Sequence, residues 1–228
     1  RQRGQVDNLL SGAHWQRGDL VETRRCLEEA LALYRASGES FGESLALNNL
    51  AVHVLFPAGR LREALEHLEE SARLAAAHPG MHLITVLCDQ GEVLAGLGRH
   101  PDAVAVLERA LALSQELQLP LGMAQARRYL GGVCTGRGEW EPARRHLLEA
   151  LQLATRLNQH DLLIQIHASL LTLYRRTGDV ERALEAAGVG LQLLAGSANS
   201  HYAVQFLAQL ALLYSDLGRM DQIGRAHV

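Results

Sequence analysis

The chain has 228 residues, a formal net charge of -3, and 48% hydrophobic but only 4% aromatic residues. Leu and Ala dominate the apolar positions, which suits closely packed helices and argues against a β-sandwich or barrel. Acidic and basic residues are interspersed, so we expect no broad basic surface and no direct contact with nucleic acid. The composition therefore predicts an all-α protein.

Cysteine use and hydropathy indicate the compartment. Cys26, Cys88 and Cys134 are odd in number and lie in apolar segments, which favours free thiols in a reducing environment. No apolar run approaches the roughly 20 residues that cross a bilayer, and no leader precedes the first helical segment. We expect a cytoplasmic protein without membrane contact. Because the sequence opens at Arg1 and stops soon after Gly218, we also expect a fragment of a longer protein.

A similar sequence motif recurs along the whole chain, and each copy begins with a glycine. The glycines are Gly18, Gly59, Gly98, Gly138, Gly178 and Gly218, spaced by about 40 residues. Self-similarity at one period is the signature of a repeat architecture. The spacing predicts a single array over residues 1–228, with five to six repeats, a turn near each glycine and no internal domain boundary.

Each repeat reads as two amphipathic helices. Apolar residues recur at spacings of three and four over residues 45–55 and again over residues 61–74. The glycine between them suits a residue that needs a positive φ after a helix. Small residues keep one phase on the second helix, as at Ala110 and Ala150, which favours a close helix pair. The interval before Gly59 is one residue longer, and we expect the extra residue at the turn, in Phe56-Pro57-Ala58.

These features resemble the tetratricopeptide repeat. The resemblance is carried by Leu130-Gly131 and its variants at Leu50-Ala51, Leu170-Leu171 and Leu210-Ala211, with Tyr174 and Tyr214 four residues before a glycine. It implies a right-handed superhelical solenoid of antiparallel helix pairs. The usual period is 34 residues, and the proline that normally closes the second helix is missing here, so both helices are expected to be longer.

Long repeats of this kind are similar to those of kinesin light chains, of polarity adaptors that bind Gαi, and of bacterial regulators that append an array to a signal-transduction ATPase. The segments at residues 31–39 and 46–51 look most like the last group. The resemblance implies a non-catalytic module that binds a protein or peptide segment, or a small effector. It also implies the regulatory arm of a larger bacterial transcriptional regulator, with no cofactor.

In this family the first helices line a concave face, where a partner peptide commonly lies. Amide side chains there can donate to and accept from a peptide backbone, and Arg128 and Arg175 would recognise a carboxylate. The candidate groove residues carried over by counting from each glycine are Asn48, Asn49, Thr85, Asp89, Glu92, Gln125, Arg128, Tyr129, Gln165, Ser169 and Arg175.

Other interpretations compete with this one. The candidate groove residues could be ordinary solvated helix positions, and the array could serve as a scaffold that self-associates through uncovered end hairpins. His78 and His82 are four residues apart, but Pro79-Gly80 separates them, so no metal site is expected. The sequence has neither a phosphate-binding loop nor a catalytic order of Ser, His and Asp, which argues against an enzyme.

Overall fold

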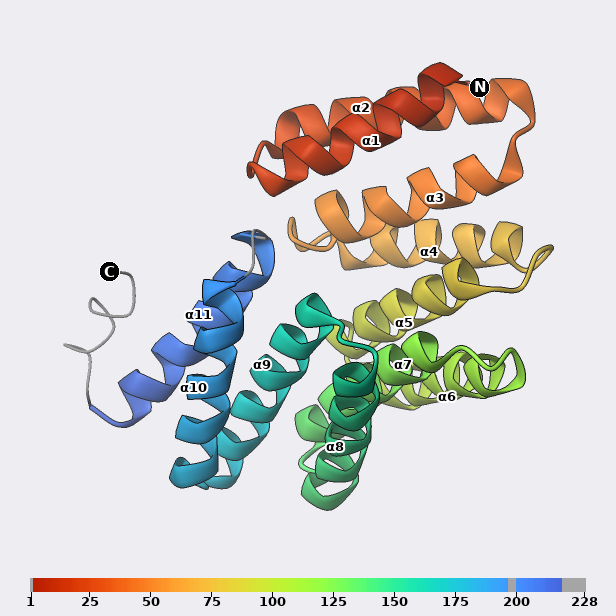
Figure 1. Cartoon of the computed structure of the whole chain (residues 1–228). Coiled ribbons are helices and arrows are strands. Elements are labelled where there is room, and N and C mark those ends of the chain that lie inside the picture. Colours follow the sequence, from red (N-terminus) through yellow and green to blue (C-terminus); the bar gives the residue numbers. More distant parts are fainter. Residues whose placement is uncertain (1, 197–199, 219–228) are drawn as a thin grey trace. The chain divides into compact units, whose positions relative to one another are not determined.

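The computed structural model describes residues 2–196 and 200–218, and it is α-helical throughout that part (Figure 1). The helices are α1 (Gln2–Gln16), α2 (Leu20–Ser37), α3 (Ser40–Leu50) with the π-helix η1 (Ala51–Leu55), α4 (Leu61–Ala75), α5 (Met81–Gly96), α6 (His100–Glu116), α7 (Pro120–Arg137), α8 (Trp140–Arg156), α9 (His160–Thr177), α10 (Val180–Ala195) and α11 (Ser200–Asp216). The all-α prediction is confirmed.

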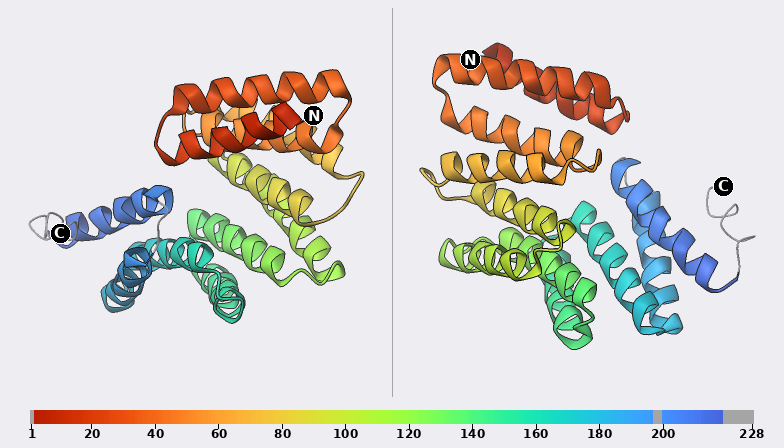
Figure 2. Two further views of the ribbon diagram at one scale, coloured as in Figure 1. Left: turned by 45° about the horizontal axis from the view of Figure 1, so that its top comes forward. Right: turned by 180° about the vertical axis from the view of Figure 1, so that it is seen from behind.

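Consecutive helices pack in pairs, as the repeat pattern predicts. Helix α1 lies beside α2, α3 beside α4, α5 beside α6, and α9 beside α10 (Figures 1 and 2). Apart from α3, which η1 extends, the helices have 15 to 18 residues, in line with the longer helices expected from the longer period. We call the odd-numbered members first helices and the even-numbered members second helices.

The helices form two compact units, residues 1–129 (unit 1) and residues 130–228 (unit 2). The division falls inside α7, which is continuous from Pro120 to Arg137. The prediction of one array over the whole chain stays a prediction, and its last ten residues lie outside the described part.

The turns inside the pairs use left-handed backbone. All six turn glycines have φ between 65° and 78°, a region that is costly for residues with a Cβ. Two further left-handed residues were not expected from the sequence. Gln118 and Asn158, with φ of 53° and 52°, lie in the connections after α6 and α8. The sequence offered no glycine there to mark them.

The extra residue before Gly59 lies in a different place from the one predicted. The first helix of this repeat ends in η1, where the Phe56 amide donates to the Ala51 carbonyl at 2.8 Å. A π-helical turn takes one more residue than an α-helical turn. The insertion is therefore absorbed inside the helix and not at Phe56-Pro57-Ala58. It follows directly after Asn48 and Asn49, whose phase in the repeat is unaffected.

Small residues let the helices approach closely. A Cβ built on Gly131 would lie 2.6 Å from the Leu147 side chain of α8, and one on Gly190 would lie 2.1 Å from the Phe206 ring of α11. Ala110 and Ala150 have no exposed surface. The glycine of the Leu130-Gly131 pair is thus a packing requirement inside unit 2.

Candidate functional site

Asp89 is the centre of a polar cluster on the first helices of unit 1. Its Oδ2 accepts from the Asn48 Nδ2 of α3 at 3.1 Å, and its Oδ1 accepts from the Tyr129 hydroxyl of α7 at 3.0 Å. Asn48 and Asp89 are 6% and 7% exposed. Three successive first helices are therefore joined through one buried carboxylate. The three residues belong to the predicted set, and the structure brings them together.

Buried side-chain atoms without a partner occur on the same first helices, α3 and α7. The Oδ1 of Asn48, the Oε1 of Gln125 and the Nε of Arg128 have no hydrogen-bond partner although each atom is inaccessible to solvent. The Arg128 guanidinium lies 3.9 Å from the centre of the Tyr129 ring, in a cation–π contact. Buried polar atoms are nearly always paired in folded proteins. These two acceptors and one donor are therefore candidate contacts for a polar ligand.

Electrostatics strongly perturb the Asp89 carboxylate. Burial raises the pKa of Asp89 to about 7, because transfer of a charged carboxylate out of water is unfavourable, and the nearby Glu92 adds to the effect. The hydrogen bonds from Asn48 and Tyr129 act in the opposite direction but are outweighed. Asp89 therefore changes its charge near neutral pH.

The remaining predicted residues of unit 1 differ in their exposure and in their hydrogen-bond partners. Asn49 is partly exposed, and its Nδ2 donates to the Asn8 Oδ1 of α1 at 3.1 Å. Thr85 donates to the Met81 carbonyl of its own helix. Glu92 is exposed. Asn8 was missed by the sequence analysis, although its distance of one repeat from Asn49 is the signal that could have found it.

The predicted residues of unit 2 are mostly bonded within their own helix. Gln165 and Ser169 donate to backbone carbonyls of α9, those of Asp161 and Gln165. Arg175 reaches the next first helix, where its Nη1 donates to the Asp216 carboxylate at 2.8 Å. These side chains do not form a cluster like that around Asp89.

One group of metal-binding residue types occurs among the described residues. Ligand atoms of His14, Glu22 and Cys26 lie within 4.8 Å of one another in the first hairpin. Arg25 already bonds the Glu22 carboxylate, at 2.8 Å, and lies 4.0 Å from the Cys26 sulfur. A cation would have to displace this guanidinium, so the group is better explained by the ion pair between Arg25 and Glu22.

None of the described helices combines the length and apolarity that crossing a membrane requires.

The chain belongs to the tetratricopeptide repeat family, since the model of that repeat matches residues 2–77, 52–116 and 122–196. Among curated proteins, none matches the sequence. Repeats of this family are typically non-catalytic and mediate protein interactions, and the match includes no catalytic family. The protein is therefore a tetratricopeptide-repeat interaction module.

Solved structures share this fold at low sequence identity. A Rap protein in complex with the competence and sporulation factor has a TM-score of 0.82 at 15% identity, over 97% of this chain and 62% of that one. A Rap conjugation gene regulator bound to a Phr peptide has a TM-score of 0.75 at 14% identity, over 99% and 60%. A signal-transduction ATPase with a tetratricopeptide repeat sensor, from Pyrococcus horikoshii, has a TM-score of 0.65 at 15% identity, over 97% and 34%. The chain thus spans about three fifths of the two Rap proteins and one third of the ATPase.

Proposed function

We propose that the first-helix face of unit 1 binds a peptide segment, and that the chain is the sensor arm of a larger bacterial regulator. The observation that carries this proposal is the set of unpartnered buried atoms on Asn48, Gln125 and Arg128, in first helices that Asp89 joins. A peptide backbone offers an N–H donor and a C=O acceptor at each residue. It can satisfy the amide oxygens of Asn48 and Gln125 and the Arg128 Nε at the same time.

Regulation is supported by the similar structures more than by the site itself. One is a Rap protein in complex with the competence and sporulation factor, and another is a Rap conjugation gene regulator in complex with the Phr* peptide. A third is a signal-transduction ATPase with a tetratricopeptide repeat sensor. A chain that spans one third of such an ATPase fits the place of a sensor. Recognition of the ligand would be relayed to domains outside these residues.

The proposal is tested with a phage-displayed library of random dodecapeptides, panned on the purified chain. Selected peptides should lose about tenfold or more in affinity with Arg128→Gln, because the buried donor and the cation are both removed. The matched control is Arg109→Gln, an exposed position on the second helix α6. Helicity by circular dichroism verifies that both variants fold. Equal affinities of the two variants, or failure to select any peptide, would contradict peptide binding at the first-helix face of unit 1.

A further inference from the structure

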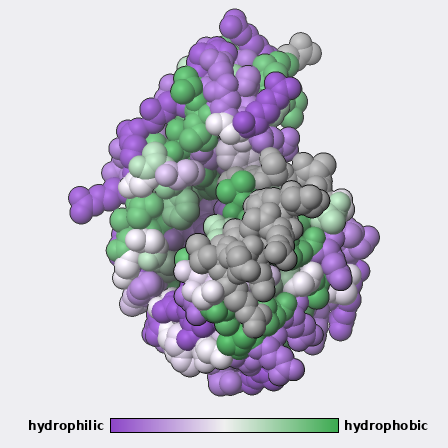
Figure 3. Space-filling model, turned by 90° about the vertical axis from the view of Figure 1, so that its left-hand side faces the viewer, coloured by the Kyte–Doolittle hydropathy of each residue, from purple (hydrophilic) through white to green (hydrophobic). Residues whose placement is uncertain are grey.

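A cleft opens in unit 2 where the start of α8, the end of α9 and the start of α10 meet. Its volume is about 220 Å³. The side chains that line it include two aromatic rings and two ion pairs, namely Trp140, Tyr174, Glu141, Arg144, Asp179 and Arg182. Hydrophilic and hydrophobic residues lie side by side at the lower edge of Figure 3, where the turn between α9 and α10 lies. We call this opening the unit 2 cleft.

The aromatic and basic residues of the unit 2 cleft depart from the repeat pattern. Trp140 lies two residues after its turn glycine, where the first, second, third and fifth repeats have Leu20, Leu61, His100 and Val180. Arg182 lies four residues after its glycine, where the first three repeats have Glu22, Glu63 and Asp102. Tyr174 lies four residues before its glycine, where the preceding repeats have His14, Leu55, Leu94 and Cys134. Since other repeats form helix pairs without these residues, pairing does not explain their presence.

A cleft in unit 1 shows which part of this arrangement is common to the repeats. It lies between the start of α4 and the end of α5, has a volume of about 300 Å³, and is lined by Leu61, the counterpart of Trp140, and by Leu97. An opening at this junction therefore recurs, whereas the aromatic walls belong to unit 2. The lining of the unit 2 cleft, more than its shape, points to a ligand.

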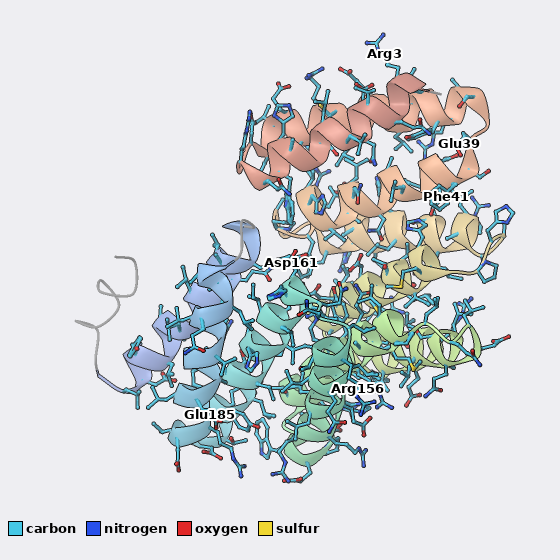
Figure 4. The ribbon with its side chains drawn as sticks, viewed as in Figure 1. Arg3, Glu39, Phe41, Arg156, Asp161 and Glu185 are labelled. Carbon is cyan, nitrogen blue, oxygen red and sulfur yellow. The ribbon has the colours of Figure 1, made fainter. Side chains whose placement is uncertain are left out.

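Charges of both signs surround the Tyr174 ring. Burial raises the pKa of Tyr174, and the nearby charges act in both directions: Arg182 and Arg144 lower it, and Asp179 and Glu185 raise it. The Arg182 guanidinium lies 5.9 Å from the centre of the ring. Figure 4 shows Glu185 on the same helix, α10. The cleft thus offers partners for a positive and for a negative group beside an aromatic surface.

The ion pairs of the cleft can be opened at little cost. The Arg144 Nη2 donates to the Glu141 carboxylate at 2.7 Å, and the Arg182 Nη1 lies 3.4 Å from the Asp179 carboxylate. These four side chains are between 35% and 78% exposed. Exposed pairs contribute at most about 1 kcal/mol. Because two guanidiniums balance two carboxylates, a ligand that carries one charge of each sign can replace these partners and leave no charge unpaired.

The volume limits the ligand to one ring and a few further atoms. A cavity of about 150 Å³ holds benzene, and pockets for drug-sized ligands begin at about 300 Å³. The unit 2 cleft lies between these limits. Tryptophan and tyrosine rings favour contact with another aromatic ring in offset or edge-to-face geometry. The ligand is thus an aromatic ring joined to a small group that carries both charges.

We propose that the unit 2 cleft binds a free aromatic amino acid. Its ring packs against Trp140 and Tyr174. Its carboxylate accepts hydrogen bonds from the two guanidiniums of the cleft, and its ammonium group donates to the two carboxylates. The site belongs to unit 2 and does not depend on the peptide site proposed for unit 1.

Titration of the purified chain with L-phenylalanine, followed by saturation-transfer NMR, tests the proposal. L-phenylalaninamide lacks the carboxylate and hydrocinnamate lacks the ammonium group. Each should bind about tenfold or more weakly than L-phenylalanine, because a charge-assisted hydrogen bond is lost. L-cyclohexylalanine keeps both charges but has no aromatic ring, and it should bind about threefold or more weakly. An analogue that binds as tightly as L-phenylalanine would contradict recognition of an aromatic amino acid.

Two variants that introduce residues of other repeats locate the binding. Trp140→Leu introduces the residue found at Leu61, and Arg182→Glu introduces the residue found at Glu22, so both should preserve the helix pairs. Each should lower the affinity for L-phenylalanine about tenfold or more, because a ring contact or a charged donor is lost. The matched control is Arg156→Gln, an exposed position at the opposite end of α8 from Trp140 (Figure 4).

Helicity by circular dichroism verifies that the three variants fold. The control should bind L-phenylalanine as the unchanged chain does. No binding of L-phenylalanine at millimolar concentration would overturn the inference. Equal affinities of the control and of the two cleft variants would place the binding elsewhere and would overturn it too.

Discussion

The first helices of the two units carry polar side chains but use them differently. In unit 1, Asp89 is buried and joins α3, α5 and α7 through neutral donors. In unit 2, α9 and α11 are linked by the Arg175–Asp216 ion pair, whose carboxylate side chain is 53% exposed, and by a hydrogen bond from the Thr172 hydroxyl to the Gln209 amide oxygen at 3.0 Å. One repeat architecture therefore supports a buried polar cluster in one unit and a solvated link in the other. Burial, more than residue type, distinguishes a candidate binding site from a surface contact.

The largest expected effect tests this comparison directly. Asp89→Ala leaves the buried Asn48 amide and the partly buried Tyr129 hydroxyl without their acceptor, which should destabilise unit 1 by about 2–3 kcal/mol. The matched change in unit 2, Asp216→Ala, should cost under about 1 kcal/mol, because an exposed ion pair contributes little. Urea unfolding measures both. Similar losses for the two variants would contradict the distinction between the units.

The second prediction concerns packing inside unit 2. Gly131→Ala places a Cβ 2.6 Å from Leu147 and should destabilise the helix pair by about 1–3 kcal/mol. Its neighbour Gly132 has no atom within 4 Å of a built Cβ, so Gly132→Ala should stabilise by up to about 1 kcal/mol through helix propensity. Thermal unfolding compares the two. A loss for both would show that α7 itself, and not the contact with Leu147, is sensitive.

The pH dependence sharpens the comparison further. Because the pKa of Asp89 is raised from 3.8 to about 7, the folded protein binds the proton more tightly than the unfolded chain. This stabilising contribution is complete below about pH 4 and is lost as the pH rises through about 7, with a slope of at most about 1.4 kcal/mol per pH unit. The control is Asp89→Asn, which cannot titrate. Parallel stability–pH curves for the wild type and this variant would refute the assignment.

The smallest expected effects lie in the connections between repeats, one in each unit. Gln118→Gly should stabilise unit 1 by about 1 kcal/mol, because its φ of 53° is costly for a residue with a Cβ. Asn158→Gly should gain less in unit 2, since asparagine tolerates the left-handed region better. Melting temperatures measure both. A larger gain at Asn158 would mean that local strain does not follow residue type in these loops.

The sequence by itself determined the all-α class, the repeat, the helix pairs and the family. These depend on regular patterns in the sequence, namely apolar residues at helical spacing and a glycine about every 40 residues. Such patterns can be recognised without knowledge of long-range contacts. It also placed Asn48, Asp89, Arg128 and Tyr129 in one candidate set. It did not separate them from Gln165 or Ser169, which occupy comparable positions on α9.

Only the tertiary structure decided which of these side chains meet, because the partners of Asp89 are about one repeat away in either direction. The register between helices decides such contacts, and a small local change can shift it. The extra residue near Gly59 shows this, since η1 absorbs it within the helix and keeps Asn48 in phase.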